Sequence, residues 1–459
     1  MRPVRSTDTD PTEPVSEGVC HTPLRVRPSI HYPHMKPTPK KLKNGMSVIL
    51  VPQKGASSMT LLVLTRVGSR YETRDISGGS HFIEHLMFKG TKKRPDTQDI
   101  SRELDRYGAE YNAYTDKDVT GYYIKMDASK TELAVDMLHD MLFHSKYDAK
   151  EMDRERGVIL EEINMYEDSP TRHVDDLLEE VFFPESTLGW NIAGTRDTVK
   201  SMTREALVKY RDAYYVPERM TVVVAGKIMP GLMTLLQKTF GSVHRPDGND
   251  VPFLPFTPPA KLKQPVAYQE KATEQVQLAI SFYGLKMGDK DLAAASLLGV
   301  ILGGGMSSRL FVEIREKRGL CYNVGAGHQA REDIGMFSIM AGLDKKRMPE
   351  AIAALYAEIK KTTKSLVTSE ELRRAKDNIR GRTMLAFEDS ATQAEWYGKQ
   401  WLFRKKVETP EERMKRFEKV TAADIRRVAK VIFRPEAMAS AVIGPFGKKE
   451  QVAKMLAWK

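Results

Sequence analysis

The spacing of apolar residues changes its period several times along the chain. Nearly continuous apolar runs at 46–51 and 59–67 are typical of buried strands, and 109–115 with 121–126 reads as a strand pair. Elsewhere apolar side chains recur every three or four positions, as in amphipathic helices. This spacing predicts helices over 80–89, 100–107, 134–143 and 151–167. Farther along, it predicts strands over 266–269 and 276–283, and helices that begin near Lys290, Met306 and Ser369.

One helix-and-strand pattern occurs twice. Residues 203–226 and 421–444 each begin with a Thr that can cap a helix and continue through an amphipathic stretch and Pro-Glu-X-Met to an apolar run that ends in Gly. Pro217 corresponds to Pro435 and Gly226 to Gly444, and every such pair is separated by the same number of positions. The constant offset predicts a duplicated unit of about 200 residues. Each copy is expected to cover a sheet with helices.

Prolines divide the chain further. Eight of the 24 prolines lie in the first 40 residues, among several acidic residues and without an apolar segment after Met1. We therefore expect an extended arm, neither a signal peptide nor a transit peptide, and a cytoplasmic protein of the bacterial type. A second proline-rich stretch predicts a linker. The predicted organisation is an arm at 1–40, a domain at 41–245, a linker at 246–265 and a domain at 266–459.

The composition excludes several classes of protein. The formal net charge is +11, which would suit a nucleic-acid partner. Charges of both signs are interleaved, however, as at 153–156, which is typical of solvated helix faces, so we expect no nucleic acid. The apolar stretch at 292–306 is too short to span a bilayer, so we expect no membrane insertion. Two cysteines cannot form a disulfide framework, which fits a reducing compartment.

The predicted helix at 80–89 contains histidine and glutamate side chains of the kind that bind metal ions. His81 and His85 are four positions apart, so both imidazoles project from one face and can bind one metal ion. Glu84 lies beside that face. Two histidines at this spacing can also be ordinary packing residues, so the metal hypothesis needs a third ligand.

A second helix, predicted over 151–167, offers that ligand. Glu155 and Glu162 are seven positions apart and share a face, whereas Glu161 does not. A single Glu on such a helix can equally belong to a solvated face. A carboxylate from this helix would complete a His-His-Glu set with one open position, which is the arrangement of catalytic zinc.

The segments HFIEHLMFKGTKKR and ERGVILEEINMYEDSP resemble the M16 (pitrilysin and insulinase) zinc metallopeptidases, in particular the short-chain, processing-peptidase-like branch. The resemblance runs from about residue 41 to the C-terminus. It implies the α+β class: two homologous αβ sandwich domains, each with a mixed, largely antiparallel sheet flanked by helices. It also implies one Zn2+ per chain, bound by His81, His85 and Glu162.

The resemblance implies roles for further residues of the first half. Glu84 matches the general base. Glu155 matches a second acidic residue of the catalytic site that orients a ligand or water. Asn112 and Ala113 match the edge strand on which substrate backbone is laid, although Asn112 taken alone would be interpreted as a turn residue.

The second half has a different signature. Gly303, Gly304 and Gly305 precede a predicted helix, but the Lys-Ser/Thr of a phosphate-binding loop is absent. Arg315 and Tyr322 match an Arg/Tyr pair that the resemblance implies to be catalytic and to contact the substrate carbonyl opposite the zinc. No second His-X-X-Glu-His occurs, which agrees with one metal site per chain.

The resemblance implies a zinc-dependent endopeptidase that hydrolyses extended or unfolded peptides in a chamber formed by two subunits. In the expected homodimer, Arg315 and Tyr322 of one protomer approach the zinc site of the other, and a heterodimer is an open alternative. The alternative function is a non-catalytic or heterodimeric assembly subunit of such a peptidase complex.

Overall fold

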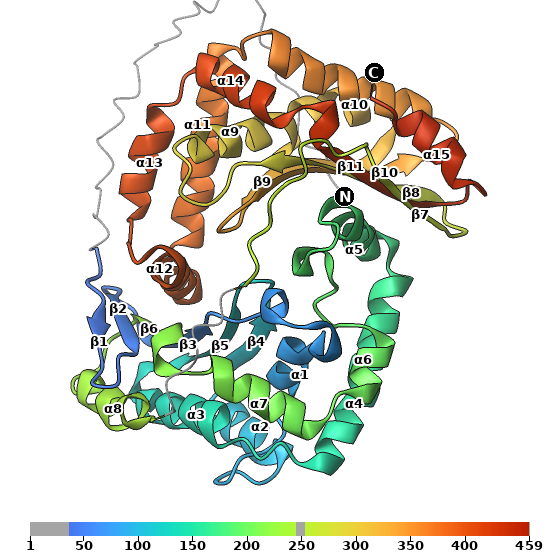
Figure 1. Cartoon of the computed structure of the whole chain (residues 1–459). Coiled ribbons are helices and arrows are strands. Elements are labelled where there is room, and N and C mark those ends of the chain that lie inside the picture. The colour runs from blue at the N-terminus through green and yellow to red at the C-terminus, as the bar shows by residue number, and fades with distance from the viewer. Residues whose placement is uncertain (1–35, 245–252, 459) are drawn as a thin grey trace, which may run out of the picture. The chain divides into compact units, whose positions relative to one another are not determined.

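The computed structural model describes residues 36–244 and 253–458, which form two α+β domains, each built around a mixed sheet (Figure 1). The predicted fold class is therefore confirmed. The first sheet has the order β1-β2-β6-β3-β5-β4 and the second has the order β7-β11-β8-β10-β9. The strands are β1 (Lys40–Lys41), β2 (Ser47–Pro52), β3 (Ser58–Thr65), β4 (Glu110–Thr115), β5 (Thr120–Asp127) and β6 (Met220–Gly226) in the first sheet, and β7 (Val266–Glu270), β8 (Gln275–Gly284), β9 (Cys321–Ala330), β10 (Gly335–Asp344) and β11 (Met438–Gly444) in the second.

Helices cover both sheets, and each half has its own apolar core. Among the described residues, no helix has the length and apolar character needed to cross a membrane. The helices are α1 (Gly79–Leu86), α2 (Thr97–Asp105), α3 (Thr131–His144), α4 (Ala149–Asp168), α5 (Pro170–Phe182), α6 (Arg196–Ser201), α7 (Arg204–Tyr214), α8 (Leu232–Lys238), α9 (Leu292–Gly303), α10 (Met348–Lys364), α11 (Ser369–Ala386), α12 (Ser390–Arg404), α13 (Pro410–Glu418), α14 (Ala422–Ile432) and α15 (Lys449–Leu456).

The duplication extends through both halves. Strands β2, β6, β3, β5 and β4 of the first sheet correspond in order to β7, β11, β8, β10 and β9 of the second. In both sheets the first of these pairs is parallel and the others are antiparallel. Helices α7 and α14 begin after Thr203 and Thr421, whose side chains cap the first turn. The constant offset seen in the sequence therefore relates α7 and β6 to their equivalents α14 and β11.

The helix predicted near Met306 is the main local difference. Residues 306–308 are turn and bend, and the following helical turn is π-helical over Phe311–Glu316. Gly303 ends α9 instead of opening a new helix. A Cβ on Gly303 would lie 2.0 Å from the backbone nitrogen of Ala326, so the glycine allows β9 to pass close to the end of α9.

The boundaries predicted from proline fall partly outside the described residues. Of the arm at 1–40, residues 1–35 lie outside them, and residues 40–41 already pair with β2 as β1. Of the linker at 246–265, residues 246–252 lie outside, and the remainder contains neither helix nor strand.

The two halves exchange helices. Helix α5, from the first half, packs on β8 and β11 of the second sheet, where its Phe182 is fully buried (Figure 1). Helix α12, from the second half, packs on β3 and β6 of the first sheet, where its Ala394 and Tyr397 are buried. Each half therefore contributes a helix to the core of the other.

Charged residues join the halves at a turn between β9 and β10. Arg70 is 1% exposed and donates to Asp118 at 3.1 Å and to Asp333 of that turn. Arg331, from the same turn, donates to Asp118 at 2.9 Å. Burial of Arg70 requires such carboxylate partners because an unpaired charge in a core is strongly unfavourable. The turn is therefore held against the first half by ion pairs.

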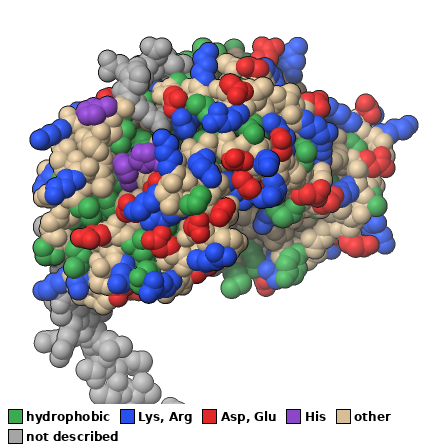
Figure 2. Space-filling view, turned by 90° about the horizontal axis from the view of Figure 1, so that it is seen from below, with side chains coloured by type: hydrophobic (Ala, Val, Ile, Leu, Met, Phe, Trp, Pro, Cys, Tyr) green, Lys and Arg blue, Asp and Glu red, His purple; other side chains and the backbone are tan. Residues whose placement is uncertain are grey.

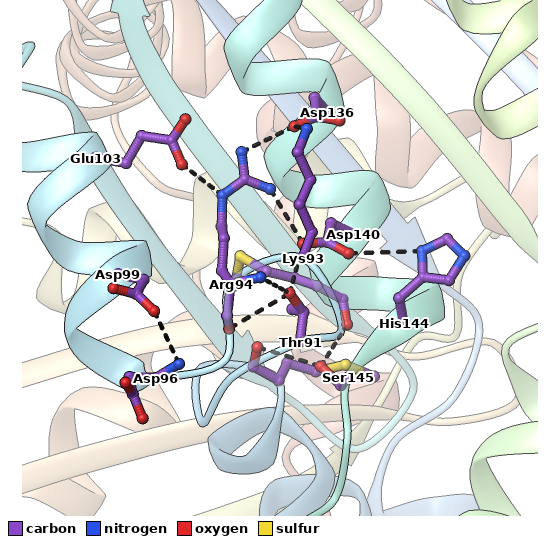
Figure 3. A network of polar contacts seen from close by, with 12 residues as sticks. Thr91, Lys93, Arg94, Asp96, Asp99, Glu103, Asp136, Asp140, His144 and Ser145 are labelled. Carbon is purple, nitrogen blue, oxygen red and sulfur yellow. Dashed lines mark hydrogen bonds and ion pairs between the residues drawn. The ribbon is translucent and has the colours of Figure 1, made fainter.

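A second buried arginine fixes the loop that follows α1 (Figure 3). Arg94 donates to Glu103 of α2 at 2.5 Å, and to Asp136 and Asp140 of α3 at 2.8 and 3.0 Å. Thr91 donates to the same Asp140 at 2.5 Å. The loop is thereby tied to two helices.

The start of α1 is held by a buried carboxylate. Glu72 is 4% exposed and accepts hydrogen bonds from the backbone N–H groups of Gly78 and Ser80 at 2.8 and 2.7 Å. N–H groups in the first turn of a helix have no partner within the helix, and a carboxylate there also suits the helix dipole. Gly78 adopts φ 91°, which favours glycine. Glu72 therefore sets where α1 begins.

The helix exchange predicts opposite effects for two glycine substitutions. A Cβ on Gly398 of α12 would lie 2.7 Å from Leu64 Cδ1 and 3.0 Å from Val223 Cγ2. We expect Gly398→Ala to lower the free energy of unfolding by about 1–2 kcal/mol because the interface is overpacked. Gly381→Ala on α11 is the matched control, because a Cβ there would meet open space. This variant should raise the free energy of unfolding by about 0.5–1 kcal/mol, since alanine favours a helix more than glycine does. Urea unfolding of both variants checks this, and a Gly398→Ala protein as stable as wild type would contradict it.

The buried Glu72 predicts a pH dependence of stability. Burial raises the pKa of Glu72 to about 7 from 4.5. Because the folded state holds this proton more tightly, the residue's favourable contribution is complete below pH 4.5 and declines as the pH rises towards 7. The difference in Tm between wild type and Glu72→Gln, wild type minus variant, should therefore fall over this range and then level off. A difference independent of pH would contradict the assignment.

Candidate metal centre

Helix α1 places three of the predicted site residues together. Phe82, Ile83 and Leu86 are fully buried in the first core. This packing turns the opposite side of the short helix, with His81, Glu84 and His85, away from the core, and those three side chains are only partly buried. The i, i+4 spacing brings the two imidazole centroids to 4.6 Å.

Helix α4 brings Glu162 to the two histidines. Its Oε2 lies 3.5 Å from Nε2 of His81 and 3.4 Å from Nε2 of His85. Ligand atoms of a tetrahedral zinc ion with bonds of about 2.0–2.1 Å are about 3.3 Å apart, so the three side chains fit zinc. In the described part of the chain, no other three His, Cys, Asp or Glu side chains converge in this way.

Glu155 contacts the ring nitrogen of His85 that does not face Glu162. Its Oε2 is 3.1 Å from Nδ1 of His85, and its Oε1 is 2.7 Å from Nζ of Lys89. Burial alone would raise the pKa of Glu155, but the hydrogen bonds with His85 and Lys89 hold it below the usual value. A carboxylate on the second ring nitrogen orients a metal-binding histidine. Our sequence reasoning missed Lys89, which lies one helical turn after His85.

Glu84 is held by a strand residue. Thr115 Oγ1, at the end of β4, donates to Glu84 Oε2 at 2.6 Å. Burial raises the pKa of Glu84 above its ordinary value. Our sequence reasoning missed Thr115 as well, although it follows Asn112 and Ala113 on the predicted strand.

The three cluster side chains differ in their affinity for protons. Burial and the imidazole of His85 lower the pKa of His81 to about 4. Burial acts on His85 too, but hydrogen bonds with Glu155 and Glu162 outweigh it and raise the pKa of His85 to about 9. The hydrogen bond from His85 lowers the pKa of Glu162. Cation binding at this cluster would therefore release a proton from His85.

Asn112 and Ala113 lie on β4, at the edge of the first sheet. The backbone N–H of Ala113 donates to Oδ1 of Asn112 at 2.8 Å. In this structure the amide side chain therefore occupies a main-chain donor of an edge strand. Asn112 is a strand residue, which excludes the turn interpretation.

Arg315 and Tyr322 are neighbours in the second half. The Arg315 guanidinium lies 4.7 Å from the ring centroid of Phe311 and 5.4 Å from that of Tyr322. Tyr322 lies on the edge strand β9 and is 70% exposed. Within the described residues, neither side chain forms a hydrogen bond or ion pair with the His81, His85 and Glu162 cluster.

On the face that Figure 2 displays, surface charge singles out no region. Figure 2 shows Lys and Arg interleaved with Asp and Glu over the face it displays. The net charge of +11 is therefore dispersed on this face.

Comparison with known proteins bears on the cluster. Residues 47–196 match the family described as insulinase, peptidase family M16, and residues 201–379 match the M16 inactive domain. A protein named uncharacterized zinc protease YmxG, from Bacillus subtilis, is 34% identical over 405 residues, which cover 88% of this chain and 97% of the relative. An uncharacterized zinc protease from Rickettsia felis is 35% identical over 411 residues, with coverage of 88% and 97%.

Solved structures agree with this match. A protease from Helicobacter pylori has a TM-score of 0.84 at 25% identity, over 89% of this chain and 99% of that one. A putative M16-like peptidase from Alicyclobacillus acidocaldarius has a TM-score of 0.79 at 20% identity, over 89% and 98%, and shows the shared fold alone. Because relatives align along nearly their whole length and both halves match domains of one family, this chain belongs to the M16 (insulinase) peptidase family.

Proposed function

We propose that the chain is a zinc-dependent endopeptidase that hydrolyses extended or unfolded peptides, with one zinc ion per chain. The observation that carries the proposal is the convergence of His81, His85 and Glu162 at distances suited to zinc, with Glu84 alongside. Relatives named zinc proteases support it.

The side chains around the cluster suit peptide hydrolysis. Zinc bound by His81, His85 and Glu162 would supply a Lewis acid that lowers the pKa of a water and polarises a carbonyl. Glu84 takes the proton of the attacking water and gives it to the leaving amine. Thr115 holds Glu84 in position for both transfers, and Glu155 orients His85.

The edge of the first sheet suits an extended substrate. A peptide that adds as a strand beside β4 would bind mainly through its backbone, which tolerates many sequences. Its carbonyl would replace Oδ1 of Asn112 as acceptor for the N–H of Ala113. A folded protein has no free strand to offer, so unfolded chains are the expected substrates.

We also propose that the active species is a dimer enclosing a chamber. The resemblance to M16 peptidases, in which this pair faces the zinc site of the other half of the chamber, supports the proposal. Within the described residues, Arg315 and Tyr322 form no hydrogen bond or ion pair with the cluster of their own chain. In the homodimer, Arg315 of the partner subunit and Tyr322 of the partner subunit would stabilise the oxyanion.

The second candidate is a non-catalytic or heterodimeric assembly subunit. This candidate is supported by the match of residues 201–379 to a domain described as inactive. Such a subunit would lack chelator-sensitive cleavage when purified alone, which separates it from the endopeptidase.

Glu84→Gln tests the proposed general base. The variant should keep one zinc per chain by metal analysis and lose about 10²–10⁴-fold in kcat on an unstructured peptide. Glu161→Gln is the matched control, because Glu161 is exposed on α4 and should be neutral. Full activity in Glu84→Gln would contradict the assignment of Glu84 as general base. Loss of zinc from this variant would show that Glu84 is a structural residue instead.

Mixing two inactive variants tests the dimer. If the pair acts across subunits, Glu84→Gln and Tyr322→Phe proteins should each be weak alone, but their mixed dimers contain one site with both parts intact. After subunit exchange, peptide cleavage should recover to about a quarter of wild type, because half of the dimers are mixed and each has one working site. Exchange without recovery would contradict the shared site.

A further inference from the structure

One cavity, whose lining includes none of His81, Glu84, His85 and Glu162, has the features of an anion site. It has a volume of about 350 Å3 and is enclosed by α9, α12, α13, the end of β9 and the turn between β4 and β5. Five basic and three acidic side chains line it: Arg331, Lys399, Arg404, Arg413, Arg416, Asp116, Asp118 and Glu408. Arg331 pairs with both aspartates. We call Arg404, Arg413 and Arg416 the arginine cluster.

Arg413, on α13, is partly buried without a carboxylate partner. Its guanidinium lies 4.7 Å from the ring centroid of Trp396 and 5.8 Å from that of Phe417. No ion pair to it occurs among the described residues. Three other arginines with little exposed side chain, Arg70, Arg94 and Arg331, each contact at least two carboxylates.

The charge around Arg413 is not balanced. Arg416 pairs with Glu408 at 2.7 Å, and Arg404 has no ion pair in the described part of the chain. Among the described residues, Glu408 is the one carboxylate that pairs with any of these three arginines. Burial and the neighbouring arginines lower the pKa of Arg413, with Glu408 acting in the opposite sense. An anion in the cavity would relieve this repulsion.

The apolar lining residues of the cavity indicate that the ligand has an apolar part. Met287, Leu292 and Phe403 line the cavity beside the arginines. A volume of about 350 Å3 is at the lower end for small-molecule sites, which combine an apolar wall with a few polar groups. Arginine binds carboxylate and phosphate groups with the same planar donors. We propose that this cavity binds a small organic oxyanion, with its carboxylate or phosphate on Arg413 and Arg404 and its apolar body against Met287, Leu292 and Phe403.

Two probes test the proposal on the full chain: phenyl phosphate and 3-phenylpropionate. At least one should raise Tm with concentration and bind by calorimetry, and added salt should weaken its binding. Which probe binds more tightly distinguishes a phosphate from a carboxylate ligand. Benzyl alcohol, which has the ring without the charge, should bind far more weakly. Failure of both probes at millimolar concentration, or equal binding of benzyl alcohol, would overturn the proposal.

Variants then locate the site. Arg413→Gln should weaken binding about tenfold or more, because a charged hydrogen-bonding group is lost. Arg404→Gln alters an exposed side chain and so should fold normally, yet bind several-fold more weakly. Arg426→Gln, on α14 outside the cavity lining, is the matched control and should bind like wild type. Unchanged affinity in both Arg404→Gln and Arg413→Gln would overturn the assignment.

Discussion

The exchange of helices between the two halves is the packing constraint on which the metal centre depends. All three ligands come from the first half, but α4, which carries Glu162, is followed after Ser169 by α5. Helix α5 is anchored in the second half, where Tyr283 donates to the carbonyl of Phe182 at 2.7 Å and their ring centroids lie 4.4 Å apart. The end of the ligand helix is therefore positioned by the other domain.

Duplication preserved the fold and changed the chemistry. The second half contains no His-X-X-Glu-His motif. Gly303, at the end of α9, has no room for a Cβ beside β9, so this position of the second half serves close packing. Strand order survives these changes because it depends on apolar faces rather than on the ligands.

Buried charges are placed with partners almost throughout the described chain. Glu72 accepts two backbone donors, and Arg70 and Arg94 each bind carboxylates from more than one element. These contacts order the start of α1, the loop after it and the turn that joins the halves. Arg413 differs from this pattern: among the described residues it contacts the rings of Trp396 and Phe417 and forms no ion pair.

Features that depend on local spacing could be predicted from the amino-acid sequence alone. The helical period placed His81 and His85 on one face and brought Glu155 and Glu162 to one side of α4, and a constant offset revealed the duplicated unit. Three other features became visible only in the folded chain: Thr115 holds Glu84, Lys89 pairs with Glu155, and α5 and α12 each pack on the sheet of the other half. Those contacts join residues far apart in the chain, or side chains whose direction is set by packing, and no local period encodes them.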